Sequence, residues 1–321
     1  MLIHGETIDD ILNDLYKYII ENGQSVSGQK GGISEVLGVY IKLTNPLSRL
    51  SISQMRGRPI SPLGELLWYL SGSNKLDFIQ YYIPQYRTYS NGDIIYGGYG
   101  PRLFNMNGEL NQIQLVIDLL KKNRTTKKAV IQIYDACDLT KTHAKDIPCT
   151  CTLQFLIRDD KLHLFANMRS NDAYKGLVHD VFCFTMMQEI VARVLNVEVG
   201  YYHHFVSSMH IYQKELPHAK DYLDEGYQSS RNIMSPMPDD NVFDNIQKVL
   251  DAEKDIRNHA YPDFDSLLLP AYWKDIVILL TMYSLRKKEG KRSYPKIQAL
   301  YKQMSNKRYG VLLRDRYLTN R

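Results

Sequence analysis

The middle of the sequence constrains the fold more than any other part. Residues 151–158 and 161–168 are typical of two strands joined by a short Asp-Asp turn, and in the second strand apolar side chains alternate with polar or aromatic ones. Residues 181–196 are apolar nearly all round, which predicts a core helix, and a further strand is expected at 199–206. Strands that surround a buried helix in this order predict an α+β fold.

Further elements are expected on both sides of this segment. Residues 7–22 carry apolar side chains on one face and predict an amphipathic helix with Thr7 as its N-cap. Residues 62–71 predict a helix that places Glu65 inside an apolar face. The remaining expectations are a polar loop at 24–34, a strand at 36–43, a Tyr- and Gly-rich loop at 85–101, a helix at 110–122, a strand at 129–134, and helices at 241–256, 271–288 and 294–306.

The chain of 321 residues is expected to form two regions. An α+β body covers 1–230, and a helical C-terminal extension, 231–321, begins with a proline-containing linker and packs on the same body. Hydrophobic residues make up 44% and charged residues 23%, which excludes a disordered chain, a collagen and a coiled-coil rod. The net charge of +5 suits an anionic partner, which could be a phosphate, a nucleotide or a polynucleotide.

The cysteine content and the N-terminus indicate a reduced, cytoplasmic protein. The N-terminus lacks the charged-then-apolar pattern of a signal peptide, and the longest strongly apolar run, Ile276 to Leu280, is too short to span a bilayer. Free thiols are therefore expected rather than a disulfide framework. The four cysteines are Cys137, Cys149, Cys151 and Cys183.

One stretch, from Asp146 to Tyr212, concentrates residues that could carry chemistry. Two further candidates, Glu65 and Tyr99, lie upstream of it. In chain order the stretch contains Pro148-Cys149, Arg169-Ser170, Asp172, Gly176-Leu177, Asp180 and His210-Ile211-Tyr212.

Simpler interpretations of these residues are also available. A cysteine at the edge of an apolar strand is usually a small buried hydrophobe. Cys149 and Cys151 form a C-x-C pair, but on a strand they would share a face with no further ligands in view, so no metal is expected. Zinc deaminases carry H-x-E followed by P-C-x-x-C, whereas this chain has His143-Ala-Lys145 and P-C-T-C. The general acid is missing and the cysteine spacing differs, so a deaminase is disfavoured.

Taken together, Pro-Cys followed by RSxDxxxGLxxD and then HxY resembles the thymidylate synthase family, and especially its branch of pyrimidine-nucleotide hydroxymethylases. The resemblance spans most of residues 1–215 and is strongest at 146–212. It implies a thymidylate synthase-like catalytic domain with a mixed sheet packed with helices. It also implies that one face of the sheet forms the interface of a homodimer.

The resemblance implies that Cys149 is the nucleophile. Carbon 5 of a pyrimidine is not nucleophilic enough to attack a one-carbon donor, but a thiolate that adds to C6 turns C5 into an enolate or enamine carbon. A nearby cation should favour the thiolate, and the resemblance assigns this role to Arg169. Arg169 and its neighbour Ser170 are also expected to bind the substrate, with the arginine on the phosphate.

Asp180 discriminates best between substrates. Thymidylate synthases carry an Asn at the matching position, and its amide pairs with N3–H and O4 of uracil. A carboxylate can instead accept a hydrogen bond from the 4-amino group of cytosine and support a proton on N3, which favours a cytosine nucleotide. The simpler interpretation is that Asp180 caps the helix expected at 181–196.

The resemblance also assigns roles to residues outside the Cys149 segment. Glu65 is expected to be the buried acid that organises water and moves protons at the base, and Tyr99 is expected to take part in proton transfer at C5. His210 and Tyr212, which alternation places on one face of a strand, are expected to bind the sugar 3′-hydroxyl. Asp172 is expected to hold the folate pterin ring.

Several positions depart from the family pattern. The family's usual His after the catalytic Cys is Thr150 in this chain. The Arg pair that reaches across the dimer to the phosphate is Lys127-Lys128, which keeps the charge but loses the bidentate fork. Lys30 lies near the place of the missing phosphate-loop Arg. The C-terminal tail that closes over folate in thymidylate synthases is not recognisable.

The sequence therefore predicts a cytoplasmic, homodimeric hydroxymethyltransferase. It would convert dCMP or CMP into the 5-hydroxymethyl derivative with 5,10-methylenetetrahydrofolate and water, without a membrane or a stable nucleic-acid partner. Two alternatives stay open. One is a divergent thymidylate synthase or dUMP hydroxymethylase, and the other is a non-catalytic nucleotide- or nucleic-acid-binding protein on the same fold.

Overall fold

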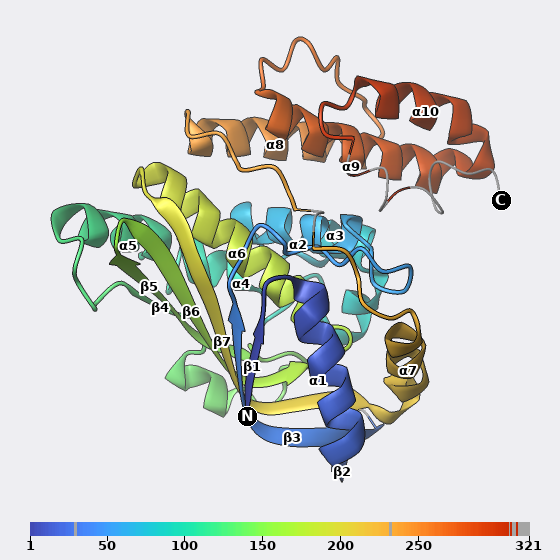
Figure 1. The fold of residues 1–321 in the computed structure, drawn as a ribbon. Coiled ribbons are helices and arrows are strands. Elements are labelled where there is room, and N and C mark those ends of the chain that lie inside the picture. Colours follow the sequence, from blue (N-terminus) through green and yellow to red (C-terminus); the bar gives the residue numbers. More distant parts are fainter. Residues whose placement is uncertain (29–30, 231–232, 308, 310–312, 314–321) are drawn as a thin grey trace. The chain divides into compact units, whose positions relative to one another are not determined.

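The computed structural model describes residues 1–28, 31–230, 233–307, 309 and 313 (Figure 1). The chain divides into two compact units. Unit 1 comprises Met1–Gly57 and Ser61–Ile233, and unit 2 comprises Arg58–Ile60 and Met234–Arg321. In the described residues, no helix is both long enough and apolar enough to cross a membrane.

Unit 1 is built on a mixed sheet, which has seven strands in the described part of the chain. The strand order is β1-β3-β7-β6-β5-β4, and β2 pairs with β3. The β1/β3 and β6/β7 pairs are parallel, and the other pairs are antiparallel. The strands are β1 (Leu2–Gly5), β2 (Gln24–Gly28), β3 (Gly31–Leu43), β4 (Val130–Gln132), β5 (Thr150–Arg158), β6 (Lys161–Asp172) and β7 (Glu198–Tyr212). This mixed sheet packed with helices confirms the expected α+β class.

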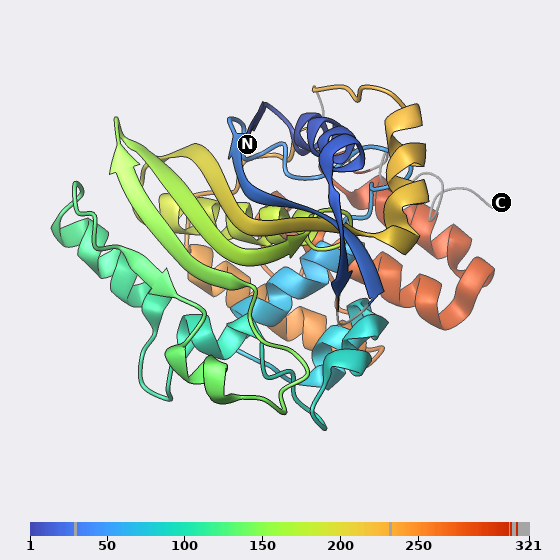
Figure 2. The same ribbon diagram turned by 90° about the horizontal axis from the view of Figure 1, so that it is seen from below.

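The central hairpin and its helix form as the residue pattern predicts. Asp159 and Asp160 adopt left-handed backbone conformations, with φ of 51° and 55°, and make the tight turn between β5 and β6. From Leu162 to Met168 every second side chain of β6 is buried, and α6 (Leu177–Val194) packs against β6 and β7. Figure 2 shows α6 on one side of these strands.

Further helices surround the sheet of unit 1. The first, α1 (Ile8–Asn22), packs against β1 and β3 and begins with a capping box, in which Thr7 and Asp10 each bond the other's backbone N–H. The others are α2 (Ile60–Leu70), α3 (Leu76–Tyr82), α4 (Tyr99–Phe104), α5 (Gln112–Lys122) and α7 (Leu216–Asp224), with short 3₁₀ turns η1 (Pro84–Tyr89), η2 (Ala136–Thr140) and η3 (Gln213–Glu215).

Two segments expected to be loops contain regular structure. Residues 24–28 form β2 and residues 31–34 the start of β3, because their backbones pair at the sheet. Within 85–101, η1 and the start of α4 form the two ends, while 90–98 contains no helix or extended strand, as expected for a loop. The loop was predicted from Tyr and Gly content alone, whereas proline at the first turn of η1 fixes a helical φ.

Unit 2 is helical, and its helices lie close to the expected positions. It contains α8 (Val242–Arg257), α9 (Ala271–Glu289), the 3₁₀ turn η4 (Gly290–Ser293) and α10 (Tyr294–Gln303). The helix α9 packs against both α8 and α10. The buried carboxylate of Asp275 accepts hydrogen bonds from the backbone N–H groups of Ser305 and Asn306, which fastens the end of the described chain to α9.

Candidate active site

The motif residues converge where β6 and β7 end. Because these strands run parallel, their C-terminal ends meet at one edge of the sheet, where Asp172 lies opposite His210. Since β5 is antiparallel to β6, it starts at this same edge, directly after Cys149. The helix α6 then begins five residues after β6 ends, which brings Asp180 to the same place.

Cys149 is half-buried and lies on a segment that Arg169 holds in place. The Cys149 carbonyl accepts the Arg169 backbone N–H at 2.9 Å. The Arg169 guanidinium donates from Nε to the Pro148 carbonyl at 2.9 Å and from Nη2 to the Ile147 carbonyl at 3.0 Å. Arg169 therefore keeps a cation beside the cysteine segment and fixes its backbone.

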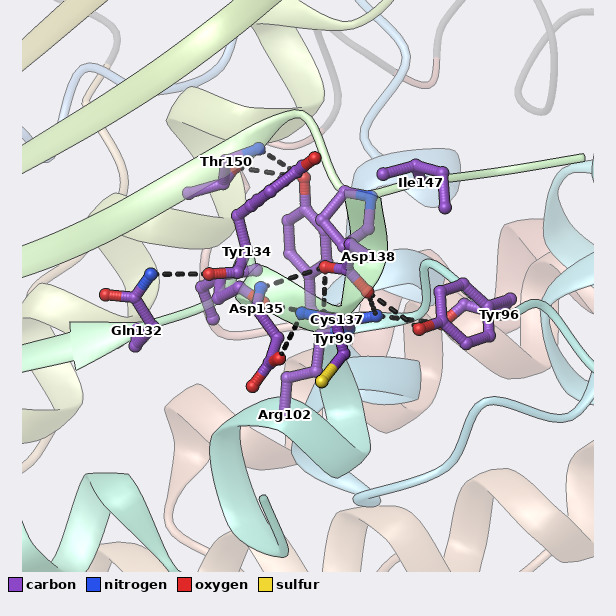
Figure 3. A network of polar contacts seen from close by, with 12 residues as sticks. Tyr96, Tyr99, Arg102, Gln132, Tyr134, Asp135, Cys137, Asp138, Ile147 and Thr150 are labelled. Carbon is purple, nitrogen blue, oxygen red and sulfur yellow. Dashed lines mark hydrogen bonds and ion pairs between the residues drawn. The ribbon is translucent and has the colours of Figure 1, made fainter. Parts of the chain in front are cut away.

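Tyr99 reaches the start of β5 from α4. Its phenol oxygen lies 2.9 Å from Thr150 Oγ1 and accepts the Thr150 backbone N–H at 3.2 Å (Figure 3). Burial and the nearby acidic groups of Asp180 and Cys149 raise the pKa of Tyr99 well above its usual value. Tyr99 is therefore a neutral phenol at the site, available as a hydrogen-bond donor.

A buried ion pair fixes α4, which carries Tyr99. Arg102 donates to both carboxylate oxygens of Asp138, at 2.7 and 2.9 Å, and also to the Ile133 carbonyl at 2.8 Å (Figure 3). Burial raises the pKa of Asp138, but hydrogen bonds from Arg102, the Asp135 backbone and Tyr96 together with the charge of Arg102 outweigh it, and the pKa falls below its usual value. The pair ties α4 to η2 and to the end of β4, so the backbone that carries the Tyr99 side chain is held in place.

Glu65, on α2, is a buried carboxylate that accepts three hydrogen bonds. Its Oε1 atom accepts the phenol O–H groups of Tyr86 at 2.5 Å and Tyr69 at 3.1 Å. Its Oε2 atom lies 2.6 Å from His179 Nδ1. Burial raises the pKa of Glu65, but the hydrogen bonds together with the charge of His179 outweigh it, so the pKa lies below its usual value.

Asp180 is a carboxyl group with the opposite behaviour. Burial, followed by the nearby negative charge of Glu65, raises the pKa of Asp180 well above its usual value, although Asn171 donates to Oδ2 at 2.7 Å. Asp180 lies inside α6, whose N-cap is Gly176. The alternative of a helix cap is therefore wrong, because the helix starts earlier than its apolar run.

Behind Asp180 lies a chain of buried polar groups. The side-chain oxygen of Asn171 is 3.2 Å from His204 Nε2, and His204 Nδ1 is 2.6 Å from the Tyr202 hydroxyl. Burial lowers the pKa of His204 to about 3, so the imidazole is neutral. Because the Asn171 amide donates to Asp180, the chain runs in one direction, from Tyr202 through His204 and Asn171.

The residues expected to bind the sugar also meet at this edge. The rings of His210 and Tyr212 pack edge to face, 5.2 Å apart, on one face of β7. His210 Nδ1 is 3.5 Å from Ser170 Oγ. Asp172 accepts the backbone N–H groups of the two residues of its own turn, Tyr174 and Lys175. Burial raises the pKa of Asp172 despite these bonds.

The lysines of the predicted phosphate site are placed differently. Lys127 and Lys128 are exposed on the segment before β4, and in the described part of the chain their ammonium groups contact none of the residues above. Lys30 lies outside the described residues.

Sequence reasoning missed several polar partners of the site, among them Tyr69, Tyr86, His179 and Asn171. Tyr69 lies one helical turn after Glu65, and this i,i+4 spacing was a usable signal. His179 directly precedes Asp180 in the GLxxD motif, but the motif drew attention to Asp180 alone. Asn171 lies between Ser170 and Asp172 and carried no separate signal.

Comparisons of the sequence with known proteins identify relatives of this chain and its family. The chain is 30% identical over 223 residues to the deoxyuridylate hydroxymethyltransferase of Bacillus phage SP01, covering 65% of this chain and 58% of that protein. It is 28% identical over 215 residues to the protein of the same name from Delftia phage PhiW-14, covering 63% of this chain and 59% of that protein. The chain thus spans less than two thirds of the length of these relatives. The thymidylate synthase family model matches residues 11–258, so this chain belongs to the thymidylate synthase family.

Proposed function

We propose that the protein is a pyrimidine nucleoside monophosphate 5-hydroxymethyltransferase that acts on dCMP or CMP. The observation that carries this proposal is the convergence of Cys149, Glu65, Tyr99 and Asp180 in a member of this family. The names of the phage relatives support the hydroxymethyl product. The co-substrate that supplies the one-carbon unit would be 5,10-methylenetetrahydrofolate, and Asp172 offers a carboxyl group that fits the N–H donors of its pterin ring.

The proposed reaction begins with addition of the Cys149 thiolate to C6 of the base. This makes C5 nucleophilic, and C5 bonds to the one-carbon unit. Loss of the C5 proton and departure of tetrahydrofolate leave an exocyclic methylene on the nucleotide. Water adds to that methylene, and Cys149 leaves as the C5–C6 double bond re-forms. Tyr99 lies beside the cysteine segment, where a phenol could relay the C5 proton.

Asp180 supports cytosine as the base. A carboxylate accepts from the exocyclic amine of cytosine, and it stabilises a proton on N3 as negative charge builds up on the ring. The one-directional chain behind it gives Asp180 an Asn171 donor on Oδ2, which leaves Oδ1 for the base. Uracil would present a carbonyl oxygen where the carboxylate needs a donor.

One observation favours dUMP as a second candidate. The pKa of Asp180 is raised by burial and by Glu65, and a protonated Asp180 could donate to O4 of uracil as an amide does. The relatives named above are also called deoxyuridylate hydroxymethyltransferases. The two candidates differ only in which protonation state of Asp180 reads the base.

We also propose that two copies of the chain pair through the sheet face opposite α6. Aromatic rings gather there: Phe165 stacks on His203 at 4.2 Å, and Tyr201 and Phe205 are 42% and 40% exposed. Burial lowers the pKa of His203 to about 4, so this imidazole adds no charge. In such a dimer the nucleotide would contact Arg169 and Ser170 of one chain, with the phosphate also reached by Lys127 and Lys128 of the other chain. His210 and Tyr212 would bind the sugar 3′-hydroxyl. A sedimentation coefficient that falls to the monomer value in Phe205→Asp would support this pairing, and a monomeric wild type would refute it.

The substrate is tested by incubating the protein with dCMP, CMP and dUMP in parallel, each with methylenetetrahydrofolate, and identifying the products by mass. The proposal expects 5-hydroxymethyl product from a cytosine nucleotide. Turnover of dUMP alone would contradict the proposed base. No turnover of any nucleotide, together with tight nucleotide binding, would favour the non-catalytic alternative.

A further inference from the structure

The side chain of His179 bridges α6 to α2 at the proposed site. Its Nδ1 atom lies 2.6 Å from Glu65 Oε2, and its Nε2 atom lies 3.2 Å from Ser61 Oγ. Ser61 and Glu65 are one turn apart on α2, so a single imidazole spans both. The His179 side chain is 21% exposed and that of Glu65 7%, so the imidazole has more access to water than the carboxylate it contacts.

The order Ser61–His179–Glu65 is also that of a Ser-His-acid triad, but a hydrolase is disfavoured. The oxyanion hole beside such a serine usually uses the backbone N–H of the next residue. Here that residue is Pro62, which has no N–H. The arrangement is better explained as an imidazole that serves Glu65.

The described contacts of Glu65 leave hydrogen-bonding capacity on one of its two oxygens. An ionised carboxylate can accept about four hydrogen bonds, two on each oxygen. The two phenols occupy Oε1, whereas His179 is the one described partner of Oε2. A water that donates to Glu65 therefore binds at Oε2, next to the imidazole.

We propose that His179 is the positioning residue that suits Glu65 to the addition of water, and thus favours the hydroxymethyl product. This inference rests on the proposed function. The water oxygen bonds to the exocyclic methylene, and the electron pair of that double bond passes through the ring to re-form C5=C6 and break the C6–S bond. Cys149 leaves as a thiolate, and the water proton passes to the Glu65–His179 pair. No oxidant or reductant is needed.

The other titratable groups that face Glu65 allow this proton transfer to be followed by pH. They are Tyr69 on α2, Tyr86 on η1, and Asp180 and Cys183 on α6. Burial keeps the pKa values of Tyr69, Tyr86 and Cys183 well above their usual ranges, so these three stay protonated near neutral pH. Tyr69, Tyr86 and Cys183 therefore add no titration step to water addition near neutral pH.

The test compares wild type with His179→Gln, whose amide can still donate to Glu65 but does not titrate. The nucleotide that wild type turns over is labelled with tritium at C5, and tritium release and 5-hydroxymethyl product are measured in the same sample. Product formation by His179→Gln should fall by about 10²-fold, the usual worth of a proton-transfer group. Tritium release should fall less than about threefold, and the pH profile of product formation should lose one limb.

A second variant distinguishes loss of the imidazole group from loss of folding. His179→Ala should regain product formation when imidazole is added, because the site is partly open to water. His4→Ala, which removes an exposed histidine of β1, should behave as wild type with or without imidazole.

Two results would overturn the inference, and they are distinguishable. If wild type makes 5-hydroxymethyl product and His179→Gln matches it in product per tritium released and in pH profile, His179 is only structural. If wild type makes no 5-hydroxymethyl product from any nucleotide, the proposed function fails and takes the inference with it.

Discussion

Glu65 and Asp180 are two carboxyl groups of the same site with opposite surroundings. Glu65 is buried but accepts hydrogen bonds from Tyr69, Tyr86 and His179, and its pKa lies below its usual value. Asp180 has one described side-chain donor, Asn171, and lies near the charge of Glu65, and its pKa lies well above its usual value. Neighbouring acids whose pKa values are pushed apart can take different roles in one reaction.

The difference follows from the elements that carry the two groups. Glu65 lies inside α2, where side chains from η1 and α6 can point at it from two sides. Asp180 lies in the first turn of α6 beside the end of β6, and its polar partner is itself part of a buried chain. We infer that Glu65 handles protons and water as a carboxylate, whereas Asp180 reads the base in a protonation state that the substrate helps to set.

The largest effect is expected from removing the charge of Glu65. Glu65→Gln keeps the shape but cannot accept the water proton, so 5-hydroxymethyl product formation should fall by about 10²–10⁴-fold. Steady-state turnover with the preferred nucleotide measures this. Near-wild-type turnover would mean that Glu65 is a structural acid, and that its difference from Asp180 has no role in catalysis.

Asp180→Asn should change which base is accepted. The amide cannot carry a negative charge, so relative turnover of dCMP over dUMP should fall by about 10–100-fold, the effect of an unpaired buried polar group worth about 1–3 kcal/mol. The readout is the ratio of kcat/KM values for the two nucleotides. An unchanged ratio would show that Asp180 does not read the base.

The same ratio should depend on pH in the wild type. Burial and the charge of Glu65 raise the pKa of Asp180, so Asp180 ionises at a higher pH than an ordinary aspartate. The preference for dCMP over dUMP should therefore rise with pH in wild type and stay flat in Asp180→Asn. A wild-type ratio that does not change with pH would contradict the assignment.

Removing the donor of Asp180 should sharpen the contrast with Glu65. Asn171→Ala takes away the hydrogen bond that favours ionised Asp180, so turnover of dCMP should fall by about 3–10-fold, as expected for the net contribution of one hydrogen bond, about 1 kcal/mol. Most of the lost dCMP turnover should be regained at higher pH, where Asp180 ionises without the Asn171 hydrogen bond. A loss that is independent of pH would indicate a packing defect instead.

The smallest effect is on stability. A raised pKa in the folded state means that the folded protein binds the Asp180 proton more tightly than the unfolded chain, so stability falls as pH rises from about 3.9 towards the folded value. Asp180→Asn should then be neutral near pH 4 and raise Tm by about 2–4 °C at pH 7–8, the shift that about 1 kcal/mol gives in a domain of this size. Thermal melts at both pH values would reveal an opposite trend.

The sequence predicted the parts of the fold that follow from local periodicity. Alternation in β6, the apolar α6 and the Thr7 cap each depend on residues within one element, and each is confirmed. The strand β2 was missed because a polar strand at a sheet edge is set by its pairing with β3 rather than by its own side chains.

The candidate site was only partly predictable for a related reason. Motif spacing pointed to Cys149, Asp180 and Glu65, but the groups that set the behaviour of the two acids come from distant segments. Tyr86 and His179 reach Glu65 from positions 21 and 114 residues away, and no local pattern encodes such contacts. The opposite pKa shifts of the two acids therefore emerged only from the folded structure.

Tritium release from C5-labelled nucleotide by wild type and Cys149→Ala tests the central claim most directly, because it reports thiolate addition at C6 even when no product leaves. The account predicts rapid release by wild type with a cytosine nucleotide and methylenetetrahydrofolate, and none above background by Cys149→Ala. Equal release by the two proteins would contradict covalent catalysis by Cys149.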